Sequence, residues 1–409
     1  MSKIQFNKAF TQQEPIPETA KKRVMELLDS GRLHRYNTVG SELSDAALLE
    51  QDFAHYQGRK YCLACTSGGY GLHIALRAMG LQAGGQVLTN AYTLAPVPGA
   101  IHAAGGQPVL VEIDENYHLD LADLKAKAKS SHAKILLLSL MRGHIPDMDR
   151  LMALCNELGL QVLEDCAHTM GGAWGKVKSG NFGQVAAFSL QTYKHLNTGE
   201  GGLVVTDDAE IAARLIMHSG AYMLYERHGA APAPEVFEQV RLTSANMSGR
   251  MDNIRAAIGL AQLPNLDDNC KRWNRRYSIL RNAIVAVPGL AIPARDARES
   301  FVGSSLQFRP IGLDGAQIPD FMSACAAQGV ELKWFGDDNP KGFTSRYDSW
   351  HYIDPMPHLP NTLRALEKTL DLRVPLTFNN EDCHLIGAVI AQVTAEFMDD
   401  SQKNPMNSG

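Results

Sequence analysis

Several features that would identify a membrane, secreted or nucleic-acid-binding protein are missing from this chain of 409 residues. No apolar run reaches the ~18 residues that a membrane-spanning helix needs. The first residues, MSKIQFNKAFTQQEP, have neither the basic start nor the apolar stretch of a signal peptide. Acidic residues outnumber basic ones by 44 to 39, so the chain has no broad positive field for nucleic acid or anionic lipid. We therefore expect a cytoplasmic protein without a membrane or nucleic-acid partner.

Cysteines are few and scattered. Their number, seven, is odd, which argues against a disulfide framework and for reduced thiols. The C-x-x-C formed by Cys62 and Cys65 lies inside the apolar run KYCLACT, and no second pair follows at zinc-finger spacing. We expect buried structural thiols rather than metal or redox chemistry.

Apolar residues make up 45% of the chain, enough for a large core divided into two or three domains. Between about residues 60 and 220, short β-rich runs alternate with helical patterns such as LADLKAKAK, MDRLMALCNELG and AEIAARLIMHS. This alternation predicts a mostly parallel sheet with helices on both faces. The predicted strands are KYCLACT, QVLTNAY, QPVLVEID, AKILLLSL, LQVLED, QVAAFSL and GGLVVTD.

The pattern changes after the loop-like stretch GAAPAP, residues 229–234. A helix interrupted near Pro264 follows and predicts a connector into a second domain. We expect a large α/β domain over residues 1–255, a smaller C-terminal α+β domain with its connecting helix over residues 256–400, and a disordered tail over residues 401–409.

A glycine-rich junction suggests an anion site. The run KYCLACT meets Ser67-Gly68-Gly69, after which apolar residues recur at helical spacing. Free N–H groups at a helix N-terminus, reached through residues without side chains, form a phosphate seat. A tight turn without a ligand is the alternative.

Two further side chains are predicted at the same edge of the sheet. In LQVLEDCAH, Asp165 ends a buried strand, at the edge where open α/β sheets bind ligands, whereas Glu164 faces the other way as a structural partner. A carboxylate there either bonds a heterocyclic N–H⁺ or caps a helix. Lys194 follows the strand QVAAFSL and is either a surface lysine or a desolvated amine that attacks a carbonyl. Phosphate seat, carboxylate and amine together are the three anchors of pyridoxal 5′-phosphate.

These stretches together resemble the sugar aminotransferases of the DegT/StrS type, within the fold-type I pyridoxal phosphate enzymes. The likeness runs from about residue 15 to 395. It is most specific in EDCAH, in GKVKSGNFGQVAAFSLQTYKHLNTGEGGLVVTDD and in RMDNIRAAIGLAQL. The resemblance implies the fold-type I architecture, with a mostly parallel central sheet in the large domain.

The resemblance also implies roles for single residues. Lys194 would form the Schiff base with the cofactor and carry protons to and from the substrate. Asp165 would pair with the pyridine nitrogen, and His168 would lie beside the ring.

A second group of implied residues binds the cofactor phosphate. Ser189 would bind it together with the amides of Gly68 and Gly69. Such enzymes are usually homodimers with the active site at the interface, and the neighbour's RMDNIRAAIG region would complete the phosphate pocket. The partner-subunit position two residues before the RM pair is Ser248, where an asparagine is usual, with Asn246 displaced along the chain.

Other positions also depart from the family pattern. Gly69 stands where a phosphate-binding hydroxyl is common. Leu94 stands where an aromatic side chain usually stacks on the pyridine ring. Tyr92 or Tyr70 is a candidate substitute for that ring, unless an aliphatic side chain suffices. The lysine itself is retained, which argues against the dehydratase branch, where a histidine occupies its position.

The stretch LMRG places Arg142 where a tyrosine is common, with His144 just past the glycine. A guanidinium there pairs with a substrate carboxylate, or else with a nearby acid such as Asp147 or Asp149. By analogy, further substrate-pocket candidates are Arg250, Trp334 and His351. Basic residues expected on a solvated helix face are Lys271, Arg272, Arg275 and Arg276.

The predicted activity is the transfer of an amino group from L-glutamate, or from glutamine, to a keto sugar. Most members of the family act on nucleotide-linked ketosugars for cell-surface polysaccharide or natural-product synthesis. Arg142 favours an acidic, nucleotide-free acceptor such as a keto-3-deoxy-octulosonate, aminated for lipopolysaccharide. The rival hypotheses are a pyridoxal-phosphate-dependent sugar lyase or dehydratase, and a non-catalytic regulator, for which we find no effector segment.

Overall fold

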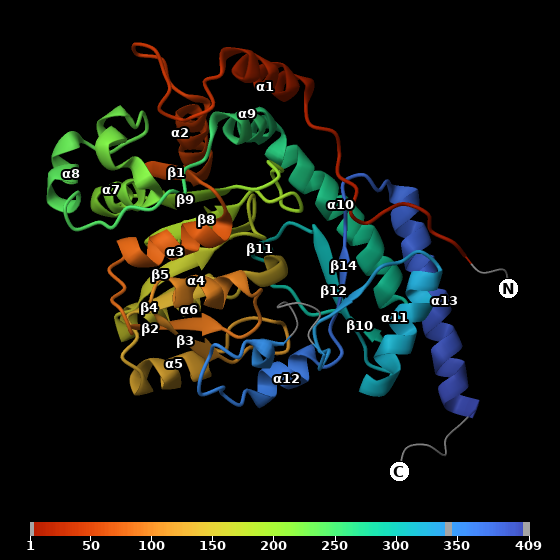
Figure 1. Cartoon of the computed structure of the whole chain (residues 1–409). Coiled ribbons are helices and arrows are strands. Elements are labelled where there is room, and N and C mark those ends of the chain that lie inside the picture. The colour runs from red at the N-terminus through yellow and green to blue at the C-terminus, as the bar shows by residue number, and fades with distance from the viewer. Residues whose placement is uncertain (1–3, 340–345, 404–409) are drawn as a thin grey trace.

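The computed structural model describes residues 4–339 and 346–403. A seven-stranded sheet with the order β1-β9-β8-β5-β4-β2-β3 lies at its centre (Figure 1). Strand β9 runs against both of its neighbours, and the other six strands share one direction. Each strand falls on one of the seven predicted runs, so the predicted mostly parallel sheet is confirmed. The strands are β1 (Tyr61–Cys65), β2 (Gln86–Asn90), β3 (Gln107–Val111), β4 (Ile135–Ser139), β5 (Gln161–Asp165), β8 (Val185–Ser189) and β9 (Gly202–Thr206).

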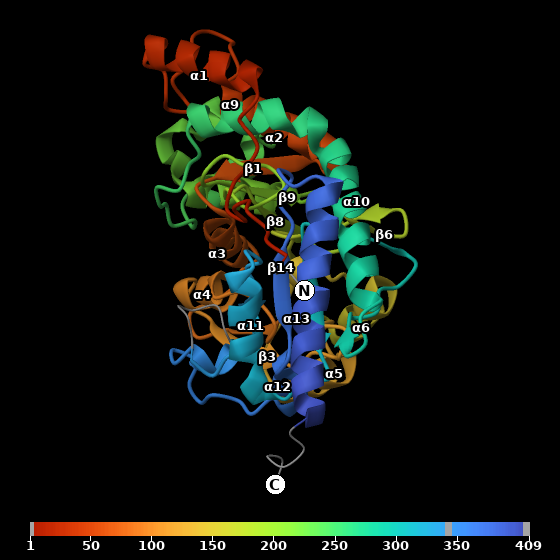
Figure 2. The same ribbon diagram turned by 90° about the vertical axis from the view of Figure 1, so that its right-hand side faces the viewer.

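Helices cover both faces of this sheet (Figures 1 and 2). Strand β4 shows why its sequence is apolar throughout. Leu136 and Leu138 belong to one core cluster, whereas Ile135 and Leu137 belong to another on the opposite face. The first cluster includes α2 (Asp45–Gln57), α5 (Leu121–Ser130) and α6 (Met148–Leu158). The second includes α3 (Gly68–Ala78), α4 (Pro96–Ala103), α7 (Ala209–Ile216) and α8 (Pro234–Val240).

A second sheet lies beside the first, with the order β10-β12-β14-β13 and antiparallel pairing throughout. Its strands are β10 (Leu290–Ala291), β12 (Ser305–Pro310), β13 (Lys333–Trp334) and β14 (Leu370–Arg373). A separate apolar core joins it to helices α10 (Leu266–Val285), α11 (Ile318–Ala327) and α13 (Asn380–Lys403). These elements are the predicted smaller α+β part.

The connection between the two parts is a broken helix, as predicted. Helix α9 (Asn253–Gln262) is followed by the short turn η4 (Leu263–Asn265), which contains Pro264, and then by α10. Helix α10 runs alongside α13 (Figure 2). The domain boundary at residue 255 stays a prediction.

Three outcomes concern the remaining sequence-based expectations. Helix α13 continues to Lys403, so the first three residues of the expected tail are helical, and residues 404–409 lie outside the described part. All seven cysteines are unpaired and buried, including Cys62 and Cys65. Within the described residues, none of the helices combines the length and apolar composition of a membrane span.

The α-helices and β-strands not yet named lie outside the two main sheets. They are α1 (Glu18–Ser30), α12 (Pro360–Leu366), β6 (Ala173–Trp174), β7 (Val177–Lys178) and β11 (Glu299–Ser300).

A buried ion pair ties α2 to the loops around it. Arg35 donates to both carboxylate oxygens of Glu50 at 2.8 and 2.7 Å, and both side chains are buried. Glu50 also accepts from the backbone N–H of Ala64 at 2.7 Å, and its Oε2 lies 3.1 Å from Nε2 of His228. Burial alone would raise the pKa of Glu50, but the charges of Arg35 and His228 lower it to about 2.

We expect Glu50→Gln to lower the free energy of unfolding by about 3 kcal/mol, because Arg35 then keeps a buried charge without its counter-ion. Urea denaturation of the two proteins measures this difference. The control is Glu26→Gln, since Glu26 is half-exposed in its pair with Arg23; it should cost less than about 0.5 kcal/mol. If Glu50→Gln and Glu26→Gln lose the same free energy of unfolding, the buried pair contributes no more stability than the exposed pair.

Candidate active site

The carboxyl ends of the parallel strands meet at one edge of the large sheet, and polar residues gather there. Asn90, Ser139, Asp165 and Ser189 are the last residues of β2, β4, β5 and β8, and all four are buried. Four neighbouring strands that share a direction therefore deliver four polar side chains to one place.

Helix α3 begins at this edge, and its N-terminus leaves N–H groups unpaired. Ser67 caps it by accepting from the N–H of Tyr70, so Gly68 and Gly69 occupy the first turn, where an α-helix supplies no acceptor. A Cβ on Gly68 would lie only 3.0 Å from Cβ of Ser189, so the serine hydroxyl is held beside the helix start. The structure thus brings together the predicted members of the phosphate seat.

The helix approaches the sheet closely because β9 also lacks a side chain at this point. A Cβ on Gly202 would lie 2.4 Å from the carbonyl oxygen of Ser67. Alanine at residue 202 would therefore push the helix start away from β8.

Asp165 is oriented by two hydrogen bonds. Its Oδ1 accepts from the N–H of Ala167 at 3.1 Å, and its Oδ2 accepts from the hydroxyl of Ser139 at 3.0 Å. The hydroxyl of Thr93 donates in turn to Ser139 at 2.7 Å. Burial raises the pKa of Asp165 above its usual value, and the N–H of Ala167, the charge of Lys194 and the hydroxyl of Ser139 oppose this shift only in part. A cationic N–H partner would stabilise the charged form further.

Glu164, the neighbouring carboxylate, faces the other side of the strand as predicted. It accepts hydrogen bonds from the backbone N–H groups of Gly180, Phe182 and Gly183, each at 2.8 Å. Glu164 therefore holds the loop before β8, whereas Asp165 is directed toward the site.

Lys194 lies in the loop that follows β8, and its amine contacts a histidine. Nζ of Lys194 is 2.7 Å from Nε2 of His168. Burial lowers the pKa of Lys194 to about 7, with Arg142 as the next cause, from its ordinary 10.5. Burial, followed by the charge of Lys194, lowers the pKa of His168 well below its usual value, so the imidazole is neutral. At neutral pH a large fraction of the lysine is an unprotonated, nucleophilic amine.

Lys194 and His168 line a cavity of about 260 Å³. Leu94 lines it, so this aliphatic side chain stands at the wall where a stacking aromatic is usual. Neither predicted substitute takes its place. Tyr92 packs against Phe335, with 5.2 Å between the ring centroids, and the hydroxyl of Tyr70 donates to the carbonyl of His218.

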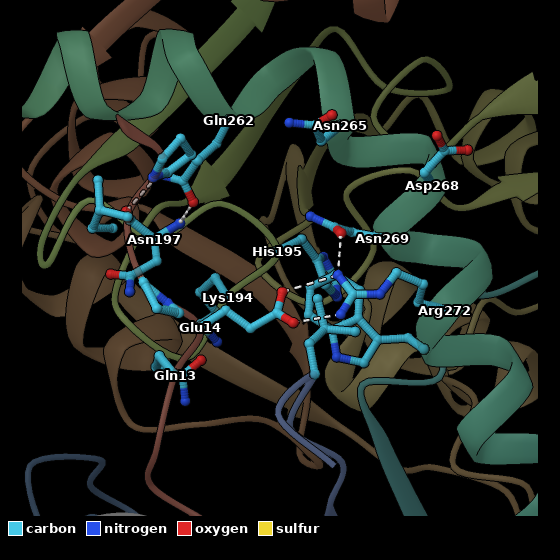
Figure 3. Close-up of a pocket in the computed structure, with 15 residues that line it drawn as sticks. Gln13, Glu14, Lys194, His195, Asn197, Gln262, Asn265, Asp268, Asn269 and Arg272 are labelled. Carbon is cyan, nitrogen blue, oxygen red and sulfur yellow. Dashed lines mark hydrogen bonds and ion pairs between the residues drawn. The ribbon is translucent and has the colours of Figure 1, made fainter. Parts of the chain in front are cut away.

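Lys194 and His195 also line a second cavity, of about 370 Å³ (Figure 3). Residues 13–17 border it on one side, and α10 borders it on the other. Glu14 and Arg272 form an ion pair between the two, and Nε2 of Gln262 donates to the carbonyl of Asn197 at 2.7 Å (Figure 3). Arg272, predicted on a solvated helix face, keeps 39% of its side chain exposed while it pairs with Glu14.

Arg142 lines the first cavity, but neither predicted acid is its partner. Its Nη2 lies 2.7 Å from Oδ2 of Asp371, on β14. Asp147 and Asp149 instead pair with Arg298, each at 3.1 Å. An ion pair was one of the two predicted alternatives; the error lies in the partner, which is more than 200 residues away in sequence.

The prediction that His144 contacts substrate is wrong. It is buried outside the cavity, where its Nε2 lies 2.7 Å from Oε1 of Gln307 and its ring packs against Tyr117. Burial lowers the pKa of His144 well below its usual value. Arg142 and Gly143 both have positive φ, 54° and 77°, so the chain turns sharply between Arg142, which lines the cavity, and His144, which does not.

Other predicted residues do not line the cavity of their own chain. Nη1 of Arg250 donates to the carbonyl of Gly220, and its Nη2 lies 3.5 Å from the exposed Ser248. Nε1 of Trp334 donates to the carbonyl of Glu367, and His351 is exposed. For Ser248 and Arg250, a contribution to a neighbouring subunit stays a prediction.

Sequence reasoning missed four residues of the site. Thr93 and Ser139 stand at or just after strand ends, and this position was a usable signal. Lys333 and Arg373 line the cavity from β13 and β14 of the second sheet. No pattern in the sequence links two short antiparallel strands to the large sheet.

Comparison with known proteins supports the arrangement. The sequence profile described as the DegT/DnrJ/EryC1/StrS aminotransferase family matches residues 15–391. The chain belongs to this family. Membership confirms the resemblance seen in the sequence; members of the family are pyridoxal-phosphate-dependent aminotransferases.

Two curated relatives illustrate the range of similarity. GDP-perosamine synthase of Caulobacter vibrioides is 34% identical over 222 residues, 54% of this chain and 57% of the relative. The spore coat polysaccharide biosynthesis protein SpsC of Bacillus subtilis is 32% identical over 277 residues, 66% and 67% of the two chains. The match thus spans just over half the length of the Caulobacter protein.

Solved structures confirm the fold. The crystal structure of 3-amino-5-hydroxybenzoic acid synthase superposes with a TM-score of 0.79 at 23% identity and covers 94% of this chain and 98% of its own. DesI, solved in the presence of its TDP-sugar product, gives a TM-score of 0.80 at 22% identity. The match covers 98% of this chain and 97% of the DesI chain. The predicted fold-type I architecture is therefore confirmed.

Proposed function

We propose that this protein is a pyridoxal-phosphate-dependent aminotransferase that moves an amino group from L-glutamate to a keto sugar. The observation that carries the proposal is the environment of Lys194. Its amine has a pKa of about 7 and borders a cavity that lies at the same sheet edge as Asp165 and the start of α3.

The residues present fit the cofactor at each of its polar groups. The N–H groups of Gly68 and Gly69 and the hydroxyl of Ser189 would hold its phosphate. Asp165 would accept from its ring N–H⁺, and Lys194 would bond its aldehyde carbon. When bound, this cofactor withdraws electrons from the substrate carbon that loses or gains a proton.

The chain itself supplies orientation and proton transfer. Lys194 would take a proton from the donor carbon that loses the amino group and supply one to the acceptor carbon that gains it, and its pKa near neutrality suits both directions. His168 positions Nζ of Lys194 through the 2.7 Å contact. The Thr93–Ser139 chain keeps Asp165 from rotating out of the site.

The family and its named members support the choice of substrates. We propose L-glutamate as donor, with glutamine as the alternative donor. The acceptor is a nucleotide-linked ketosugar or an acidic keto-octulosonate, used in cell-surface polysaccharide or lipopolysaccharide biosynthesis or in natural-product biosynthesis. The names of the Caulobacter and Bacillus proteins concern perosamine and a spore coat polysaccharide. The seven unpaired cysteines support a cytoplasmic location.

Exposed apolar side chains support a homodimer with the active site at the interface. The loop of residues 33–43 lies beside residues 227–253: Nη2 of Arg227 is 3.5 Å from the carbonyl of Thr38, and Asn253 donates its N–H to Leu33. Apolar side chains exposed on these and nearby segments favour a protein contact. They are Leu33, Val39, Leu43, Tyr222, Met223, Leu242 and Met247.

The test is to incubate the enzyme with ¹⁵N-labelled glutamate and candidate keto sugars. The proposal expects the bound cofactor to change from its aldehyde to its amine form with glutamate alone, and the label to appear in an amino sugar after an acceptor is added. A lyase or dehydratase would leave the cofactor as aldehyde, and that result would overturn the proposal.

The pH dependence of cofactor attachment follows from the pKa of Lys194. Only the neutral amine attacks the aldehyde, so the attachment rate of cofactor-free enzyme should rise with pH through about 7 and then level off. An amine with the ordinary value of 10.5 would keep gaining rate until well above pH 9. Stopped-flow absorbance measures the profile. Arg142→Gln should move the midpoint upward, since Arg142 is a cation that lowers this pKa.

A further inference from the structure

Three cations from separate elements meet in the active-site cavity. Arg142 comes from the turn η1 (Met141–Gly143) after β4, Lys333 begins β13, and Arg373 ends β14. All three line the cavity of about 260 Å³ that contains Lys194. Arg142 is held there in a left-handed backbone conformation, with φ 54° and ψ 24°, which few residues other than glycine adopt.

One carboxylate balances these charges, and it is already occupied. Asp371 accepts from Arg142 at 2.7 Å and from Nε2 of Gln307 at 2.7 Å. Within the described residues, no acid pairs with Lys333 or Arg373. These two lie over aromatic rings instead: Lys333 Nζ is 4.8 Å from the centroid of Phe335, and the Arg373 guanidinium is 3.8 Å from that of Tyr193.

Unbalanced charges in a partly buried cavity raise the free energy of the unliganded protein. Burial, together with Arg142, lowers the pKa of Lys333 to about 8. Nε of Arg142 is buried without an acceptor among the described residues. An anion in this cavity would pair with all three cations. The proposed phosphate seat is a different place, because it is formed by α3 and β8.

We propose that Arg142, Lys333 and Arg373 form a carboxylate seat that the two substrates occupy in turn, and that the acceptor is therefore an acidic keto sugar. This inference rests on the proposed aminotransferase function. Donor and acceptor react at the same lysine, so the seat that pairs with the α-carboxylate of glutamate also faces the acceptor. A neutral acceptor would leave Lys333 and Arg373 without an acidic partner among the described residues.

The first test compares steady-state kinetics of four variants. Lys333→Gln and Arg373→Gln should each raise the KM for glutamate by about 10- to 100-fold with a smaller change in kcat, since each loses one charge-assisted contact with the bound carboxylate. Lys333→Arg should restore most of the affinity. Lys271→Gln, which removes a charge from the exposed face of α10, should leave KM unchanged.

The second test does not depend on turnover. Maleate, an unreactive dicarboxylate, should raise the pH at which the cofactor absorbance of the wild-type holoenzyme titrates, because an anion beside the lysine nitrogen stabilises its protonated form. The shift should be lost in Lys333→Gln and kept in Lys333→Arg. Uridine diphosphate is the second probe, and it should cause no shift, since the proposal assigns this seat to a carboxylate and not to a nucleotide phosphate.

Several outcomes would overturn the seat. They are an absent maleate shift in the wild type, an equal shift in Lys333→Gln, a larger shift with uridine diphosphate, or equal turnover of acidic and carboxylate-free keto sugars. Three of these need only wild-type protein. Failure of the proposed function looks different, because the protein then shows no cofactor band to titrate and no transfer from glutamate.

Discussion

Lys194→Ala should abolish amino transfer while leaving the protein folded. The variant lacks both the amine that bonds the cofactor and the group that moves the proton, so kcat should fall by at least about 10³-fold. The side chain is buried and contacts His168, which is neutral, and Asp165 keeps its hydrogen bonds from Ala167 and Ser139 when the lysine is removed. Initial rates and thermal unfolding of the same preparation measure the two effects.

The matched control is Lys271→Ala, a lysine on the exposed face of α10. Its activity should equal that of the wild type. An external primary amine in the assay should restore part of the activity of Lys194→Ala, since it replaces the missing proton carrier. Activity within tenfold of wild type in Lys194→Ala would place the chemistry on another residue.

Asp165→Asn should give the second-largest loss. An amide does not stabilise a protonated ring nitrogen, so the cofactor becomes a weaker acceptor of electrons, and kcat should fall by about 10²- to 10³-fold. The amide is nearly the same size as the carboxylate. Its single oxygen can still accept from the N–H of Ala167, and its NH₂ group can donate to the hydroxyl oxygen of Ser139. Stability should therefore change little, and absorbance shows whether the cofactor is still bound.

Two further substitutions test whether the charge of Asp165 or its orientation matters for kcat. Glu164→Gln removes a carboxylate from the neighbouring residue, which bonds only backbone N–H groups on the opposite face of β5. It should reduce stability and leave the catalytic constant of folded enzyme within about threefold. The loss of kcat in Ser139→Ala should lie between the losses in Asp165→Asn and Glu164→Gln, because Asp165 can then rotate. Equal losses of kcat in Asp165→Asn and Glu164→Gln would contradict the assignment.

The large sheet could be predicted from the sequence because its strands are buried on both faces. The run ILLLS in β4 contains no polar residue before Ser139 at its end, and helical periodicity returns between such runs. The predicted strands differ from the observed ones by at most three residues at either end. The second sheet has short strands of two to six residues, whose pattern is too brief to separate from loops.

Some residues of the candidate active site could likewise be predicted from the sequence, and others could not. Residues that follow a buried strand, such as Asp165 and Lys194, were found because the parallel sheet sends every strand end to one edge. Arg142 was found in the cavity, but its partner Asp371 was missed. That pair joins two sheets, and the sequence carries no signal for how the sheets face each other.

The error at His144 has a local cause. The prediction treated residues 142 and 144 as neighbours that face the same ligand. Two consecutive residues with positive φ reverse the chain between them, and a non-glycine residue in that conformation is rarely predicted. Side-chain direction in such a turn depends on tertiary contacts, here on Gln307 of β12.

The most direct test of the account is to add pyridoxal phosphate to the purified protein, reduce the complex with borohydride and map the modified peptide by mass spectrometry. The account predicts a pyridoxyl group on Lys194 at one per chain, and loss of that adduct when glutamate is added before the reductant. An adduct on a different lysine, or none at Lys194 at saturating cofactor, would contradict the account.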